Sequence, residues 1–114
     1  MALSCLVNAL LVVNKDPGFN KNTEVPFVQM MEVFDATMLC ADCETIRTSR
    51  SRHCYVCKRC VERYDHHCPW INNCVGFNNH NCFFLYVTSI SVLLLISLTE
   101  SFYTLSQMIN MGYA

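Results

Sequence analysis

Ten cysteine and histidine residues are gathered in the middle of the chain. They are Cys40, Cys43, His53, Cys54, Cys57, Cys60, His66, His67, Cys68 and Cys74. Thiolates and imidazoles are ligands that zinc prefers, and a C-x2-C pair on a turn can direct two thiolates at one ion. This segment also has too few aliphatic side chains to form a core of its own. Its repeated C-x2-C spacing therefore predicts metal sites that hold it together.

These residues exceed what two zinc sites need. A structural zinc site takes four ligands, and an adjacent histidine–cysteine pair favours two interleaved sites over one. Two Cys3His sites leave one cysteine and one histidine over. The surplus falls in the run Asp65-His66-His67-Cys68, where carboxylate, imidazole and thiol have the residue types of an activated nucleophile. The alternative is that Cys68 is a ligand and that Cys74 or Cys60 is the spare thiol.

A long apolar segment follows the cysteine-rich region. No Asp, Glu, Lys or Arg occurs from His66 to Thr99, and only hydroxyl side chains interrupt the apolar run Cys82–Leu98. As a helix this run spans about 25 Å, slightly less than the ~30 Å hydrocarbon core of a bilayer. We predict a transmembrane helix over residues 79–100 and a short tail over 101–114. The alternative is the buried helix of a soluble domain, which would have little else in the chain to cover it.

The region before the cysteines divides into two parts. Residues 1–13 are apolar but too short to cross a bilayer, and they have no basic start or cleavage site typical of a signal peptide. We interpret them as a partial transmembrane helix. The residue types of Asp16-Pro17-Gly18 favour a turn, which would end this helix. The turn lies in a linker over residues 14–39. A short apolar patch in that linker (Val28, Met30, Met31, Val33 and Phe34) is interpreted as local packing or membrane-surface contact.

Charge is distributed unevenly along the chain. All Lys and Arg residues precede the long apolar segment, and a single Glu follows it. By the positive-inside tendency, the cysteine-rich part over residues 40–78 faces the cytoplasm. Thiols stay reduced there, so metal or catalysis explains them better than disulfides. A net charge of -1 argues against a nucleic-acid partner bound by bulk electrostatics.

The complete pattern resembles the cysteine-rich domain of the DHHC protein S-acyltransferases, or palmitoyltransferases. The matching residues are Cys40-x2-Cys43-x9-His53-Cys54-x2-Cys57-x2-Cys60-x4-Asp65-His66-His67-Cys68-Pro69-Trp70-x3-Cys74-x4-Asn79-x3-Phe83. Asp16-Pro17-Gly18 resembles a further motif of that family. The resemblance implies an α-helical membrane protein with a small zinc-stabilised cysteine-rich domain of short β-hairpins and loops. The chain is then expected to be a fragment of a four-helix transmembrane fold.

The same resemblance implies a role for each site residue. Cys40, Cys43, His53 and Cys60 would bind one zinc ion, and Cys54, Cys57, His67 and Cys74 a second. Cys68 would be the nucleophile that accepts the acyl group, with His66 as its base and Asp65 orienting that histidine. Trp70 would lie at the lipid boundary beside the acyl chain, with ordinary packing on the zinc domain as the alternative.

The implied function is a protein-cysteine S-palmitoyltransferase that moves a fatty acyl group from palmitoyl-CoA to protein cysteines through a Cys68 acyl-enzyme. Its partners would be acyl-CoA, the lipid bilayer, and cytoplasmic or membrane proteins with a juxtamembrane cysteine, without nucleic acid. We expect an integral protein of the endomembrane system (ER, Golgi or plasma membrane). The alternative is an inactive or regulatory membrane-anchored zinc-binding module.

Other polar and thiol residues receive simpler interpretations. The basic residues between Arg47 and Arg63 are attributed to topology and anionic lipid, with the phosphates of CoA as the alternative ligand. His80 is interpreted as an interfacial polar residue. Cys5 and Cys82 are interpreted as inert thiols in apolar segments, although a cysteine flanking a membrane helix can itself be acylated.

Overall fold

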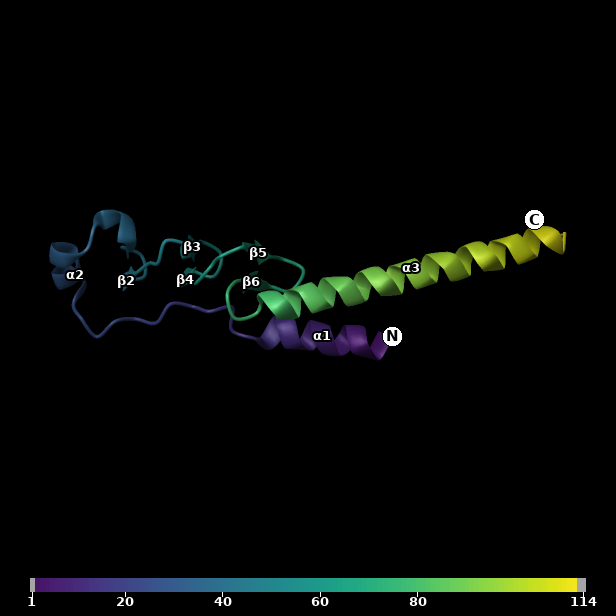
Figure 1. The fold of residues 1–114 in the computed structure, drawn as a ribbon, viewed down its shortest axis with the longest axis horizontal. Coiled ribbons are helices and arrows are strands. Elements are labelled where there is room, and N and C mark those ends of the chain that lie inside the picture. The colour runs from purple at the N-terminus through teal and green to yellow at the C-terminus, as the bar shows by residue number, and fades with distance from the viewer. Residues whose placement is uncertain (1, 113–114) are drawn as a thin grey trace.

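The computed structural model describes residues 2–112. The molecule is long and narrow, with principal extents of 79 × 21 × 18 Å. Two helices form one end, and three small hairpins follow one another towards the other end (Figure 1). The hairpins therefore lie between the long helix and the far tip of the molecule.

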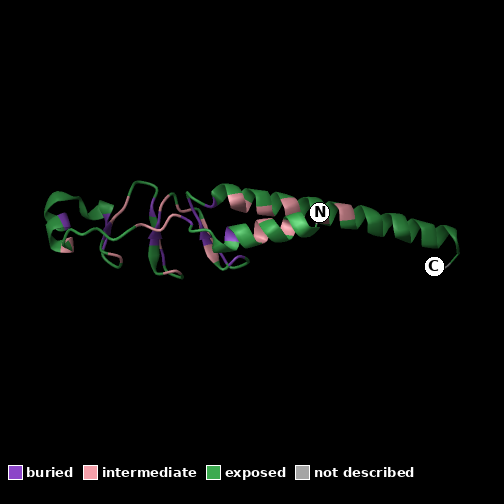
Figure 2. Ribbon diagram, turned by 90° about the horizontal axis from the view of Figure 1, so that it is seen from below, coloured by how far each residue is buried: buried purple, intermediate pink, exposed green. Residues whose placement is uncertain are grey.

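The helical end consists of α1 (Ala2–Asn14) and α3 (His80–Asn110), with α1 alongside the first part of α3 (Figure 1). At 1.5 Å per residue α3 is about 46 Å long, more than the ~30 Å hydrocarbon core. It is long and apolar enough to cross a membrane. No α3 residue is fully buried: most of its length is exposed, and partly buried residues occur in its first half (Figure 2). Hydroxyls within it bond back to the helix, as Thr88 Oγ1 does to Phe84 O at 2.8 Å.

The length of α3 differs from the sequence-based expectation. The helix was expected to end at residue 100 and to be followed by a tail, but it continues to Asn110. No glycine or proline interrupts the chain until Gly112. Leu, Gln and Met in this stretch favour helix, so the backbone has no reason to leave it earlier. Glu100 is therefore a residue within the helix.

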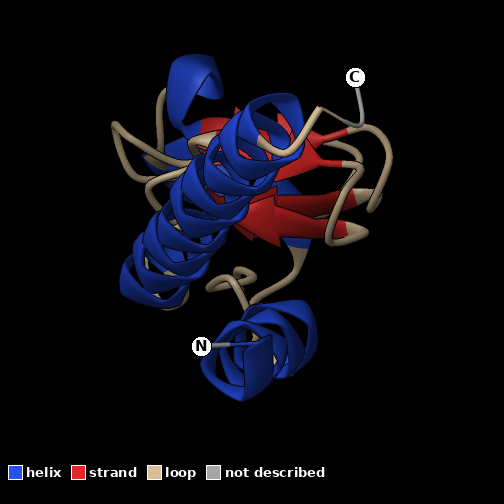
Figure 3. Ribbon diagram, turned by 90° about the vertical axis from the view of Figure 1, so that its right-hand side faces the viewer, coloured by secondary structure: helices blue, strands red, loops and turns tan. Residues whose placement is uncertain are grey.

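The cysteine-rich region folds as three antiparallel two-stranded hairpins. The strands are β1 (Leu39–Cys40) with β2 (Thr45–Ile46), β3 (Arg52–Cys54) with β4 (Arg59–Val61), and β5 (His66–Cys68) with β6 (Asn73–Val75). Viewed along the long axis, the strands overlap because the hairpins stand in a row (Figures 1 and 3). Strands this short do not form stable hairpins by themselves, so other interactions must hold them.

The hairpins repeat one pattern every 14 residues. In each, the residue that follows the C-x2-C position of the turn has a positive φ: 50° at Glu44, 53° at Lys58 and 47° at Asn72. The second hairpin reads His53-Cys54-x2-Cys57-x2-Cys60, and the third reads His67-Cys68-x2-Ile71-x2-Cys74. Cys68 thus occupies the place of a C-x2-C cysteine, with Ile71 where its partner would be. This repeat was not predicted, although the cysteine and histidine positions recur in the sequence at a shift of 14 residues.

The linker over residues 14–39 contains two short helical elements, α2 (Phe27–Val33) and the 3-10 turn η1 (Ala36–Met38). Met30 of the apolar patch is buried, whereas Val28, Met31 and Val33 are exposed. Because α2 lies at the opposite end of the molecule from α3 (Figure 1), the patch is far from the helix that could cross a membrane. The membrane-surface interpretation of this patch does not fit that arrangement.

The Asp16-Pro17-Gly18 turn joins α1 to the hairpins. Asp16 Oδ1 accepts hydrogen bonds from the N–H groups of Gly18 (2.7 Å) and Phe19 (2.9 Å). Burial raises the pKa of Asp16, but the lowering effects, led by these two hydrogen bonds, outweigh burial. The pKa of Asp16 therefore lies below its ordinary value. Gly18 has a φ of 104°, a conformation that suits glycine. Its carbonyl accepts from Glu62 N at 2.8 Å, which ties the turn to the hairpin β3–β4.

Candidate metal centres and thiol site

The first group of candidate ligands joins the first and second hairpins. The Sγ atoms of Cys40, Cys43 and Cys60 and the imidazole of His53 lie within 4.8 Å of one another. From His53 Nδ1 the distances are 3.2 Å to Cys43 Sγ, 3.6 Å to Cys40 Sγ and 3.8 Å to Cys60 Sγ. With Zn–S bonds of about 2.3 Å, ligand atoms of a tetrahedral site stand roughly this far apart.

The second group joins the second and third hairpins in the same way. It contains Cys54, Cys57, His67 and Cys74, again with ligand atoms within 4.8 Å of one another. His67 Nδ1 lies 3.4 Å from Cys57 Sγ, 3.6 Å from Cys74 Sγ and 3.7 Å from Cys54 Sγ. The structure therefore brings together the same eight residues, in the same two groups of four, as the resemblance implied.

Strand pairing explains how the two groups interleave. His53 pairs with Cys60 across β3 and β4, and His67 pairs with Cys74 across β5 and β6. Each group takes a histidine and a cysteine from one hairpin and two turn cysteines from the hairpin before it. One ion in each group would therefore link two hairpins, which is the support that such short strands need.

The donor atoms and their environment fit a soft dication. Burial, together with the neighbouring thiols of Cys40 and Cys43, raises the pKa of the Cys60 thiol to about 12. Burial and the nearby thiols of the second group raise the pKa of Cys74 in the same way. Three clustered thiols cannot all ionise at neutral pH unless a positive charge lies among them. Three sulfurs and one imidazole are a donor set that suits tetrahedral zinc.

Cys68 lies apart from both groups within the described residues 2–112. Only 5% of its surface is exposed, and it shares a buried apolar cluster with Val12, Ile71 and Val75. Cys82, Phe83 and Tyr86 from the first turns of α3 pack against this cluster. In each Cys3His group, the later of the two hairpins supplies the histidine and one cysteine. In the part of the chain that the structure describes, no further hairpin lies next to the third one; α1 and α3 lie there and surround Cys68 with apolar side chains. The third turn therefore has no partner ligands for an ion among these residues. This placement disfavours the alternative in which Cys68 is a ligand and Cys60 or Cys74 is spare.

His66 and Asp65 stand beside this thiol. His66 and Cys68 are two residues apart in β5, so their side chains point to the same face of the strand. His66 Nδ1 lies 3.5 Å from Asp65 Oδ1. The imidazole meets the Phe83 ring edge-on, with centroids 5.3 Å apart. Phe83 thus contacts both the histidine and the cluster that buries Cys68.

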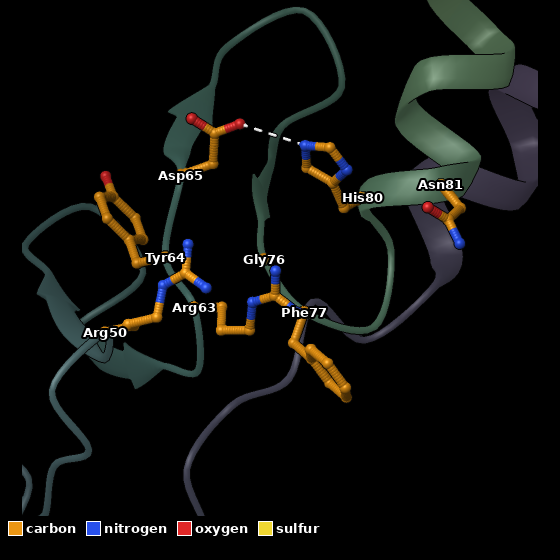
Figure 4. A pocket seen from close by; sticks show the side chains of 8 residues that line it. All are labelled: Arg50, Arg63, Tyr64, Asp65, Gly76, Phe77, His80 and Asn81. Atoms are coloured by element: carbon orange, nitrogen blue, oxygen red, sulfur yellow. Dashed lines mark ion pairs between the residues drawn. The ribbon is translucent and has the colours of Figure 1, made fainter.

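A cavity of about 490 Å³ opens next to Asp65 (Figure 4). Its lining includes Arg50 and Arg63 together with Asp65 and His80. The guanidinium of Arg63 also lies over the Phe77 ring, at 5.3 Å from its centroid. The neighbouring basic residue Arg59 instead stacks on Phe19, at 4.0 Å. The basic residues therefore divide into two that border the Asp65 cavity and others that lie elsewhere.

The structure also shows the surroundings of Trp70, His80 and Cys82, which were interpreted from the sequence alone. Trp70 is 90% exposed on the turn between β5 and β6, so the alternative of packing on the cysteine-rich domain is wrong. His80 Nε2 lies 3.7 Å from Asp65 Oδ2, so His80 belongs to the site. Cys82 Sγ lies 3.6 Å from the Lys15 ammonium group.

Two asparagines shape the site, and sequence reasoning assigned a role to neither, although Asn79 is one of the motif residues. Asn73 Nδ2 donates to the carbonyls of Val12, Val13 and Lys15 at 3.4, 3.3 and 2.9 Å, which caps the end of α1. Asn79 is fully buried. Its side chain accepts from Gly76 N and donates to Cys74 O, at 2.9 and 2.8 Å. The position of Asn79 directly before an apolar helix could have indicated its structural role.

Comparison with known proteins agrees with the pattern of residues. The family described as DHHC palmitoyltransferase matches residues 33–114. The chain belongs to this family. The family is membrane-embedded, in keeping with the length and apolarity of α3. The short hairpins, the paired Cys/His groups and the long apolar helix confirm the fold class predicted from the sequence.

Individual relatives carry the same family name. Palmitoyltransferase akr1 of Schizosaccharomyces pombe is 34% identical over 113 residues, which cover 92% of this chain and 18% of the relative. Palmitoyltransferase ZDHHC3 of Homo sapiens is 37% identical over 97 residues, 82% of this chain and 31% of the relative. Palmitoyltransferase ZDHHC8B of Danio rerio is 43% identical over 83 residues, 69% of this chain and 10% of the relative. The chain thus spans less than a third of each of these proteins.

Proposed function

We propose that the protein is a protein-cysteine S-palmitoyltransferase whose Cys68 carries the acyl group between palmitoyl-CoA and a protein thiol. The observation that carries the proposal is the position of Cys68: it lies outside both Cys3His groups and faces α1 and α3, next to His66 and Asp65. Family membership and the names of the relatives support the same activity.

The two Cys3His groups are proposed to hold one zinc ion each. Cys40, Cys43, His53 and Cys60 would bind the first, and Cys54, Cys57, His67 and Cys74 the second. Zinc in such closed sites keeps the thiolates ionised and stabilises the fold. This leaves the chemistry to the residues of the third hairpin.

The proposed reaction consists of two thioester exchanges. In the first, His66 takes the proton of Cys68, with Asp65 holding its Nδ1–H so that Nε2 is free to act as the base. The Cys68 thiolate forms a C–S bond with the acyl carbonyl while the C–S bond to CoA breaks, and the CoA sulfur receives the proton from His66. In the second, a substrate thiol repeats the exchange and restores the Cys68 thiol.

The site is suited to a substrate with a fatty tail. Each CH₂ that stays in lipid contributes about 0.8 kcal/mol, so a thiol at the start of a membrane helix can react while the tail remains in the bilayer. Cys68 packs beside Phe83 and Tyr86 at the beginning of α3. Arg50 and Arg63 border the cavity next to Asp65, where phosphates of CoA would find positive charge. Trp70, exposed beside this end of the molecule, is proposed to meet the lipid boundary.

The proposed membrane placement follows from charge. All Lys and Arg residues precede α3, which supports a cytoplasmic position for the hairpins. An endomembrane is the proposed location. Protein substrates would then be cytoplasmic or membrane proteins whose cysteine lies near the bilayer surface.

The test is acyl labelling of the full chain in lipid bilayers. Incubation with labelled palmitoyl-CoA should give a hydroxylamine-labile label that disappears in Cys68→Ser while the zinc content stays at two ions per chain. Cys5→Ser, in α1, is the matched control and should keep its label. Two zinc ions without any label would instead support the inactive or regulatory module, and a label lost in Cys82→Ser but kept in Cys68→Ser would refute the assigned nucleophile.

A further inference from the structure

The first residue of the long helix reaches back to the carboxylate beside the candidate nucleophile. His80 Nε2 lies 3.7 Å from Asp65 Oδ2, and His66 Nδ1 lies 3.5 Å from the other oxygen, Oδ1. Figure 4 shows Asp65 and His80 pointing towards one another along the cavity wall. Within residues 2–112, these two histidines are the basic side chains that lie within 4.0 Å of the Asp65 carboxylate. The carboxylate is therefore held between two imidazoles, one on each oxygen.

The backbone fixes the distance between Asp65 and His80. Asp65 N donates to Val75 O at 2.9 Å, and His80 N donates to Gly76 O at 3.0 Å. Val75 and Gly76 are consecutive, so both side chains are anchored to one short stretch of chain. The buried Asn79 braces that stretch through its bonds to Gly76 N and Cys74 O. The meeting of Asp65 with His80 is thus a property of the folded backbone.

Asp65 needs such a second contact because it is not buried. Half of its side-chain surface is exposed (51%), and the side chains of His66 and His80 are exposed to a similar degree. A carboxylate with a single partner in that setting can rotate about its χ2 angle, whose preferences are broad, and turn its oxygens towards water. A second imidazole close to the opposite oxygen, at 3.7 Å, opposes that rotation and keeps Oδ1 directed at His66.

We infer that His80 is a positioning residue for acyl transfer, which holds the Asp65 carboxylate in place so that this carboxylate fixes the tautomer of His66. This role of His80 in catalysis depends on the proposed function. Because His80 begins α3, it also ties the orientation of Asp65 to the start of the helix that could cross the membrane. The role differs from that of Asp65 and His66, since His80 acts only through the carboxylate.

The kinetic test compares His80→Leu with His80→Gln, whose amide can still donate to Asp65. With the full chain in bilayers, His80→Leu should slow Cys68 acylation about tenfold at saturating palmitoyl-CoA with little change in KM, a part of the 10²–10⁴ that a positioned base supplies. His80→Gln should restore most of the rate. In an Asp65→Asn background, His80→Leu should have no further effect, because the two residues act as a unit.

Two kinetic results would overturn the inference: equal losses from His80→Leu in both backgrounds, or equal losses from Leu and Gln. Nitrogen NMR of histidine-labelled chain gives an independent readout that does not require acylation. His66 should be a single Nδ1–H tautomer in the wild type and a mixture in His80→Leu, with zinc content unchanged; an unaltered tautomer contradicts the inference. If the wild type is never acylated, the proposed function fails while the tautomer still tests the contact.

Discussion

Among single residues, Gly76 shows most directly how closely the parts of the site approach one another. A Cβ at this position would lie 2.5 Å from Val61 Cγ1, 2.6 Å from Pro17 O and 3.0 Å from Glu62 O. Two of these neighbours are backbone atoms, which cannot move aside cheaply. Glycine therefore allows the turn after α1, the hairpin β3–β4 and the segment leading to α3 to meet at one point.

We predict that Gly76→Ala lowers the free energy of unfolding of the zinc-loaded chain by about 1–3 kcal/mol, the usual cost of overpacking. The midpoint of thermal unfolding in detergent, followed by circular dichroism, measures this. Gly112→Asn is the matched control: among the described residues, and apart from its chain neighbours, a Cβ at that position would meet no atom within 4 Å, and asparagine tolerates its positive φ of 76°. Equal midpoints for Gly76→Ala and the control would contradict the close approach.

At the scale of elements, the hairpins depend on the Cys3His groups and the helices do not. Strands of two or three residues offer few hydrogen bonds, whereas α3 satisfies its own backbone over 31 residues. Metal binding must displace the proton from Cys60, whose pKa is raised to about 12 without an ion. Binding therefore releases protons, and the affinity for zinc should fall as pH falls.

A strong chelator should accordingly unfold the hairpins and spare α3. We expect tryptic cleavage at Lys58 and Arg59 to accelerate by an order of magnitude or more once local order is lost. The helical circular dichroism of the chain in bilayers should persist. Acidification should release zinc by the same proton competition, and added zinc at neutral pH should restore protection. Cleavage that stays slow after complete removal of zinc would show that the hairpins hold themselves together.

For the whole molecule, the arrangement of charge relative to the helices matters most. Six of the eight basic residues lie between Arg47 and Arg63, on the second hairpin and the segments next to it, and α3 extends away from this region (Figure 1). Two of them, Arg50 and Arg63, border the cavity beside Asp65, while Arg59 stacks on Phe19. An acyl-CoA with its tail in the bilayer would bring its phosphates to the first two.

We predict that Arg50→Gln and Arg63→Gln each raise the KM for palmitoyl-CoA three- to tenfold, from the loss of roughly 1 kcal/mol per contact, with kcat nearly unchanged. Steady-state acylation kinetics at several salt concentrations measure this. Arg59→Gln is the matched control and should leave KM unaltered. A uniform rise in KM for all three variants would indicate a diffuse electrostatic effect in place of a bound phosphate.

The local spacing of residues was enough to predict much of this protein. The C-x2-C pairs, the surplus thiol near Asp65 and the uncharged stretch after His66 are read directly from neighbouring positions, because turn-borne ligands and membrane helices are local features. The resemblance to the DHHC family was sufficient to group the eight ligand-type residues. The end of α3 was misjudged, because helix propensity beyond Glu100 outweighs the drop in hydropathy.

Only the tertiary structure decided how distant segments meet. Cys68 faces apolar side chains of α1 and α3, and within residues 2–112 no further hairpin with ligands lies next to it. This arrangement depends on packing between residues that lie far apart in the sequence. The contact of His80 with Asp65 and the cap that Asn73 forms on α1 have the same origin. Side-chain contacts across long loops follow from the folded path of the backbone, which spacing along the chain does not encode.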